Sequence, residues 1–144
     1  MSLSAAPLPA SWAVQLGLYA ALEASAELSA VSPTGIGLYD QVPDEPVFPF
    51  LTIGEARCET YPGVEGAREH EIRIRAYSRH GGRRELKIIT EAVRAAVEGL
   101  SVDGHRVAQA RFVFADVFRQ PDQDTFGSVL RFRIVTETIS REQP

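Results

Sequence analysis

The chain of 144 residues is 44% hydrophobic and 24% charged, and its formal net charge is −4. This length favours a single domain with a core large enough to form without a metal or a disulfide. The negative charge gives the whole molecule no attraction to nucleic acid. The lone Cys58 excludes an intrachain disulfide, and no segment approaches the ~20 apolar residues of a membrane span.

The chain begins with a stretch rich in Ser, Ala and Pro, residues 1–10, which we expect to form a flexible arm. Residues 1–22 contain an apolar run but lack the basic region of a signal peptide, so we expect a soluble protein made in the cytoplasm. Ser11 is expected to cap a first helix that runs from Trp12 to Ala26 or Glu27.

This first helix is apolar around most of its circumference. Gln15, Glu23 and Glu27 form one narrow row with Tyr19, whereas a surface helix normally has a wider polar face. We therefore expect the helix to be covered on two sides, by its own sheet and by a neighbouring subunit. The alternative is that its alanines are simply exposed, which costs little free energy.

Turn and proline signals separate this helix from the first long strand. A turn and a short extended piece (residues 32–40) precede a segment with three prolines (43–49), which exclude a regular helix there. A strand is then expected from Phe50 to Cys58 or Thr60.

The stretch from Arg68 to Leu100 follows a hairpin loop at Tyr61–Gly66 and organises the chain. It predicts a strand, a two-glycine break and an amphipathic helix. Ile72, Ile74 and Ala76 share one face of the strand. After the break, the apolar positions recur at helical spacings: Leu86, Ile89, Val93, Ala96 or Val97, and Leu100. Gly99 is expected to end the helix in the left-handed conformation.

The next strand is expected from about Arg106 to Arg119. Strict alternation places Phe112, Phe114 and Phe118 on one face. The other face is apolar too, with Val113, Ala115 and Val117. A strand that is apolar on both faces suits the centre of a sheet or a contact with a second chain.

The last strand is expected over residues 127–139, after a polar turn at 120–124. Its inward positions are Leu130, Phe132 and Ile134, and its outward positions are Arg131, Arg133 and Glu137. Two paired strands of this length reach ~40 Å, which is longer than a compact domain needs. We therefore expect the hairpin to project or to lie against a neighbour.

The order of elements predicts an α+β fold. We expect a mainly antiparallel sheet of about four strands packed with two helices, plus a long C-terminal β-hairpin. The expected domain covers residues 11–140, followed by a short tail at 141–144.

The sequence contains no evident catalyst. His70, His80 and His105 have no partner at zinc-ligand spacing, and the nucleotide-binding and hydrolase motifs are missing. The glycines before the second helix could receive an anion, but such a pair is far more often only a turn. We expect no catalytic residue, no cofactor and no metal.

Arginine accounts for fourteen of the fifteen basic residues, with Lys87 as the exception. Genomic composition bias explains this most simply, and use of arginine at polar protein–protein contacts is the alternative. The outward arginines at positions 73, 75, 131 and 133 share their rows with Glu71 and Glu137. Cross-strand ion pairing is therefore favoured over a basic stripe that binds nucleic acid.

Six short motifs, in order, resemble a family of phage proteins. They are Leu38–Pro43, Phe48–Glu55, Arg68–His70, Tyr77–Gly82, Phe112–Asp116 and Leu130–Arg133. The resemblance spans about residues 12–138. The family is that of the tail terminators, or tail-to-head joining proteins, of siphophages, prophages and gene transfer agents.

The resemblance implies an assembly function. Such proteins form a hexameric ring that caps the tail tube, ends its polymerisation and joins it to the connector or stopper of the head. The implied partners are further copies of the chain, the tube protein and the head-side stopper, with DNA only passing through the lumen. The implied location is the bacterial cytoplasm during assembly and then the head–tail junction of the particle.

We expect the interface residues at the edges of the domain: Trp12, Leu16, Tyr19, Tyr61, Val64, Arg119, Asp122, Arg131 and Arg133. Two alternatives stay open. The protein could be another minor tail or head-completion protein of the same particle. A small binding or enzymatic domain would instead require a buried polar pocket with convergent titratable groups, which the sequence does not predict.

Overall fold

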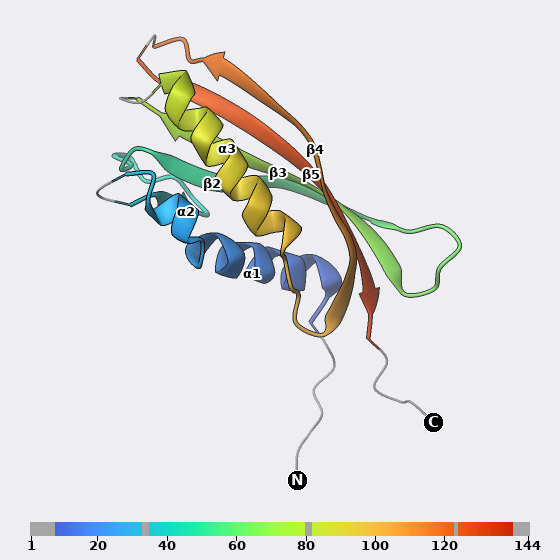
Figure 1. Cartoon of the computed structure of the whole chain (residues 1–144). Coiled ribbons are helices and arrows are strands. Elements are labelled where there is room, and N and C mark those ends of the chain that lie inside the picture. The colour runs from blue at the N-terminus through green and yellow to red at the C-terminus, as the bar shows by residue number, and fades with distance from the viewer. Residues whose placement is uncertain (1–7, 33–34, 80–81, 123, 140–144) are drawn as a thin grey trace.

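A five-stranded sheet with two long helices on one face forms the protein (Figure 1). The computed structural model describes residues 8–32, 35–79, 82–122 and 124–139. In chain order the elements are α1 (Ala10–Glu23), α2 (Ala26–Ser29), β1 (Gly37–Tyr39), β2 (Phe50–Thr60), β3 (Ala67–Ser78), α3 (Gly82–Glu98), β4 (His105–Arg119) and β5 (Phe126–Thr138). The strand order is β1-β2-β3-β5-β4, with β1 parallel to β2 and the other neighbours antiparallel. The expected α+β class is confirmed. The structure has one more strand and one more helix than we expected, the short β1 and α2.

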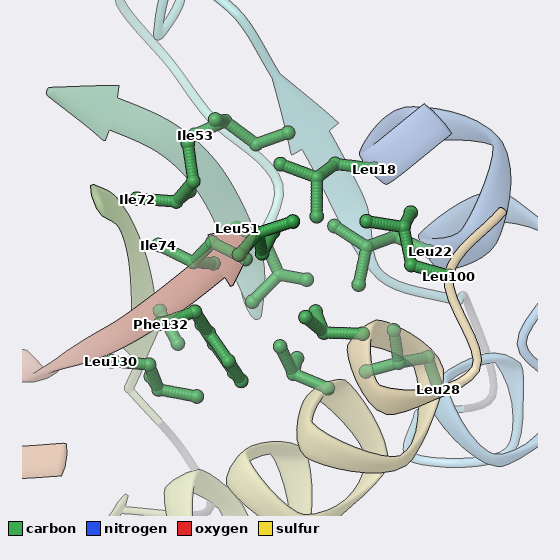
Figure 2. Close-up of a cluster of buried hydrophobic side chains, with 14 of the residues drawn as sticks. Leu18, Leu22, Leu28, Leu51, Ile53, Ile72, Ile74, Leu100, Leu130 and Phe132 are labelled. Atoms are coloured by element: carbon green, nitrogen blue, oxygen red, sulfur yellow. The ribbon is translucent and has the colours of Figure 1, made fainter. Parts of the chain in front are cut away.

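The core lies between the helices and one face of the sheet (Figure 2). Its fully buried side chains include Val14 and Leu18 of α1, Ile89 and Val93 of α3, and Leu51, Ile74, Leu130, Phe132 and Ile134 of the sheet. Each Leu, Ile or Phe buried in this way contributes roughly 1.5–3 kcal/mol. The inward positions that alternation predicted for β3 and β5 are confirmed.

The first helix differs from its sequence prediction at both ends. Helix α1 covers Ala10–Glu23 with Pro9 at the N-cap, so Ser11 lies inside the first turn and caps nothing. The helix stops before Ser25 because the hydroxyl of Ser25 accepts a hydrogen bond from the backbone N–H of Leu28 at 3.1 Å and starts α2. The predicted Ser11 cap and the single continuous helix are both wrong.

A β-bulge in β4 changes the direction of its aromatic side chains. Phe112 lies opposite Phe132 on the helix-covered face, with the two ring centroids 5.6 Å apart. The register then shifts by one residue at Val113, so Phe114 pairs with Arg131 on the opposite face. The expectation that the three phenylalanines of this strand share one face is therefore wrong, since one extra residue breaks the alternation.

The C-terminal hairpin is built into the sheet. Strand β5 pairs with β3 from Phe126 to Glu137 and with β4 on its other side, so this hairpin does not project. The projecting hairpin is β2–β3, whose tip extends beyond the helices (Figure 1). Because β1 pairs only with Phe50–Thr52, the second half of β2 is exposed.

The strand–helix unit at the centre of the chain matches its prediction, apart from two residues of the break, His80 and Gly81, which lie outside the described residues. All five principal apolar positions of the helical stretch are buried: Leu86, Ile89, Val93, Val97 and Leu100. The helix ends at Glu98, next to Gly99. Gly99 does not take the left-handed conformation that we expected.

Candidate assembly surfaces

The sheet face opposite the helices carries cross-strand ion pairs. Arg131 of β5 pairs with Glu71 of β3, and the Nε of Arg133 lies 2.6 Å from a carboxylate oxygen of Glu69. The hydrogen bond from Arg131 is the main reason that the pKa of Glu71 lies below its usual value. The predicted cross-strand pairing is confirmed, so the outward arginines do not form a bare basic stripe.

The ion pairs continue toward β2. Arg75 forms a two-pronged contact with Glu55, and this hydrogen bonding lowers the pKa of Glu55 to about 2. Arg73 lies between, with its guanidinium 3.9 Å from both Glu55 and Glu71. Because Glu55 is exposed to solvent, which screens the charges, these pairs contribute little to stability. Together these pairs form a polar surface with a fixed pattern of charge.

Aromatic side chains share this open face with the ion pairs. The guanidinium of Arg131 lies 5.8 Å from the ring centroid of Phe114. Phe118 packs its ring against the backbone at Gly127, where a Cβ atom would lie 2.6 Å from the ring. Sequence reasoning missed the direction of these two side chains relative to Phe112, because the pattern of apolar residues does not reveal the bulge.

A pocket of about 490 Å³ lies where β2 begins and β3 ends. Its lining comes from three distant segments: Val42, Phe48, Phe50, Thr52, Tyr77, Arg79, Gln120, Pro121, Asp122 and Thr125. The ring of Phe50 stacks on Tyr77 at 4.9 Å, and the guanidinium of Arg79 lies 4.3 Å from the centroid of Phe48. Sequence reasoning missed this pocket, since no local spacing brings the three segments together.

The β4–β5 turn depends on Asp122. One carboxylate oxygen accepts backbone hydrogen bonds from Asp124 and Thr125, each at 3.0 Å, and the other accepts one from the hydroxyl of Thr125. The backbone hydrogen bond from Thr125 is the largest of the effects that lower the pKa of Asp122. Arg119, at the end of β4, lies over the ring of Phe126 at 5.4 Å. Both predicted interface residues thus have structural roles at this turn.

Helix α1 presents an apolar stripe to solvent. On this helix Trp12 is 50% exposed and Leu16 is 43% exposed, and Leu8, which precedes the helix, is 40% exposed. Tyr19 is half-buried, and its pKa is raised by burial and then by the nearby carboxylate of Asp40. Exposed apolar side chains that lie together are typical of surfaces that contact another protein.

The tip of the β2–β3 hairpin exposes Tyr61 and Val64. Gly63 and Gly66 have φ angles of 83° and 82°, which other residues rarely adopt, so they allow the tight loop. The loop is closed by a hydrogen bond from the N–H of Tyr61 to the carbonyl of Ala67 at 3.1 Å. The tip is therefore an ordered knob with two apolar side chains.

The described histidines have structural partners. The Nε2 of His70 is 2.9 Å from the hydroxyl of Thr136 in the buried layer, and the Nε2 of His105 is 2.8 Å from the carbonyl of Leu8. Among the residues that the structure describes, no group of His, Cys, Asp and Glu side chains is placed to hold a metal ion.

The sequence of the chain matches a known family model over residues 17–137, the tail completion protein gp17 family. The chain belongs to this family. Among curated proteins, none is similar enough in sequence to count as a relative. No helix in the described part of this gp17-family chain is long and apolar enough to cross a membrane.

One similar solved structure is a chain of the virion of the native gene transfer agent particle. It superposes with a TM-score of 0.78 at 25% sequence identity, and the match covers 90% of this chain and 98% of that chain. The resemblance seen in the six motifs is thus confirmed. The family and this structural match together support a structural role in completing a phage-like tail or head.

The predicted interface residues of this tail completion protein lie in separate places. Trp12 and Leu16 are on the outer side of α1, Tyr61 and Val64 are at the hairpin tip, and Arg131 and Arg133 are on the open sheet face. The structure does not gather them into one site.

Proposed function

We propose that this protein assembles as a hexameric ring on the end of a tail tube, stops tube polymerisation and joins the tail to the connector of the head. The observation that carries the proposal is the match over 90% of the chain to a gene transfer agent virion chain. The family description, tail completion protein, agrees with it.

The proposed mechanism is assembly through complementary surfaces. A closed ring needs two different surfaces on each subunit that bind each other head to tail. The ring presents one face to the last tube ring and a different face to the head-side stopper. Growth ends because the second face does not match another tube subunit, so the next tube ring has nothing to bind.

The surfaces described above suit these contacts. The stripe around Trp12 and Leu16 and the knob with Tyr61 and Val64 are exposed apolar surfaces of the kind buried between subunits. The net charge of −4 fits a ring through which DNA passes without being held. We assign no catalytic role to any residue, and we place the protein in the particle after assembly in the bacterial cytoplasm.

Deletion of the gene in its own particle tests the proposal. We expect tails of uncontrolled length that are not joined to heads, together with filled or empty free heads, when lysates are viewed by negative-stain electron microscopy. A plasmid copy of the gene is the control and should restore joined particles of uniform length. Tails of normal length in the deletion strain would contradict tail termination and would favour a head-completion role.

A further inference from the structure

Charge is unevenly divided along the chain. Residues 1–56 contain six carboxylates and no Lys, Arg or His, so their formal charge is −6, whereas residues 57–144 hold 15 basic and 13 acidic residues and carry +2. Glu55 is paired with Arg75. The other five carboxylates are all exposed: Glu23, Glu27, Asp40, Asp44 and Glu45. They belong to α1, α2 and the segment after β1, on the β1 side of the sheet (Figure 1).

The segment Asp40–Val47, which we call the acidic loop, combines charge with apolar surface. Asp44 and Glu45 are exposed, and Val42 and Val47 are 47% and 54% exposed on either side of them. The N–H of Val47 donates to the hydroxyl of Tyr39 at 3.2 Å, which ties the end of the loop to β1. Neither Asp44 nor Glu45 has a cation within ion-pair distance in the described part of the chain.

The first turns of α3 carry the complementary features. A groove of about 670 Å³ between α2 and α3 is lined by Glu27, Arg83, Arg84, Lys87, Ile88, Glu91 and Ala92. Arg83 lies over the ring of Phe126 at 4.9 Å, while Arg84 and Lys87 have no ion-pair partner among the described residues. Ile88 is 43% exposed beside them. The groove has three cationic side chains and two carboxylates, and the side chain of Ile88 is exposed to solvent within it.

We propose that the acidic loop of one copy docks into the α2–α3 groove of the next copy and forms the repeating contact of the ring. Asp44 and Glu45 would face Arg84 and Lys87, and Val42 or Val47 would cover Ile88. This inference rests on the proposed ring of copies and names its two surfaces. A head-to-tail contact needs two different, complementary surfaces on one chain, and these two have opposite charge and matching exposed apolar side chains.

Charge reversal tests the contact, with assembly of joined particles as the measurement. Purified protein is added to an extract of the deletion strain, and joined particles are counted by electron microscopy. The groove variant Arg84→Glu/Lys87→Glu and the loop variant Asp44→Lys/Glu45→Lys should each lower the count at least about tenfold, because like charges then face each other. The control variant Arg57→Glu/Arg106→Glu makes the same change in net charge as the groove variant. It alters two exposed arginines of β2 and β4, away from both surfaces, and should leave the count near wild type.

Mixing the two defective variants is the decisive experiment. In a ring with an even number of subunits the two variants can alternate, so each acidic groove meets a basic loop and each basic groove meets an acidic loop. An equal mixture should therefore restore the count to within about threefold of wild type. The variant that combines all four substitutions should also give a count of joined particles near wild type.

The outcomes separate this inference from the proposed function. The inference is overturned if either double variant assembles normally, or if both fail and the mixture also fails. Rescue in the combined variant without rescue in the mixture would overturn it too, because the contact would then lie within one chain. The proposed function fails separately, if wild-type protein does not restore joined particles at all. Equal melting temperatures of the variants show that they are folded.

Discussion

Acid should destabilise the fold through one buried histidine. Burial, then the charges of His105 and Arg68, lower the pKa of His70 from 6.5 to about 4 in the folded protein. The unfolded chain takes up this proton below about pH 6.5, whereas the folded chain does so only near pH 4. His70 stabilisation is therefore complete above pH 6.5 and is lost as the pH falls. The slope is about 1.4 kcal/mol per pH unit, and the total loss is about 3 kcal/mol.

The window between pH 6.5 and 4.5 isolates this effect. The carboxyl groups of Glu55 and Glu71 have lowered pKa values, so their stabilisation is lost only below about pH 4.5, where the unfolded chain begins to protonate them. We expect the free energy of unfolding, measured by urea titration at several pH values, to fall across the window in the wild type. His70→Gln should lower stability at pH 7 and remove most of the slope.

His105→Gln is the matched control, since it removes a second buried histidine. Burial is the largest cause of the lowered pKa of His70 and the charge of His105 a smaller one, so this variant should keep most of the slope. The reasoning is refuted if the wild-type free energy of unfolding is constant from pH 6.5 to 4.5. It is also refuted if the slope survives in His70→Gln, because the proton uptake would then belong to another group.

Three further predictions concern packing and assembly. Phe132→Ala should cost about 3–5 kcal/mol in urea unfolding, because the side chain is fully buried, and a cost below about 1 kcal/mol would contradict the core described above. Gly17→Ala should destabilise by about 1–3 kcal/mol although Ala favours helices, since its Cβ would lie 2.8 Å from the carbonyl oxygen of Ser101; a higher melting temperature would show that α1 does not pack there. Trp12→Glu should leave the melting temperature unchanged and lower incorporation into particles in the extract assay, and normal incorporation would remove the α1 stripe from the interface.

Local patterns predicted the elements and their core faces well. The alternation around Ile72 and Ile74 and the helical spacing from Leu86 to Leu100 depend only on neighbours a few residues apart, and both were confirmed. The predicted ends of α1 were wrong, because a local pattern does not show which of several nearby serines accepts a hydrogen bond from a free backbone N–H. Ser25 does so and Ser11 does not.

Long-range pairing accounts for what local patterns missed. The outward arginines were correctly expected to pair with carboxylates, but their partners on β3 and β2 depend on strand order. The open-face aromatics, the pocket at Phe48 and Tyr77 and the α2–α3 groove all join segments that are distant in the chain. No spacing in one segment contains that information.

The sequence by itself determined the α+β class, the two apolar layers and the kinship with tail completion proteins, because each is written in local periodicity or in ordered motifs. Only the tertiary structure decided that β5 lies between β3 and β4, that the bulge at Val113 sends Phe114 away from the core, and that the β2–β3 hairpin is the one that projects. Register and strand order depend on how all the strands pack together against the helices, and these contacts join segments that are distant in the chain.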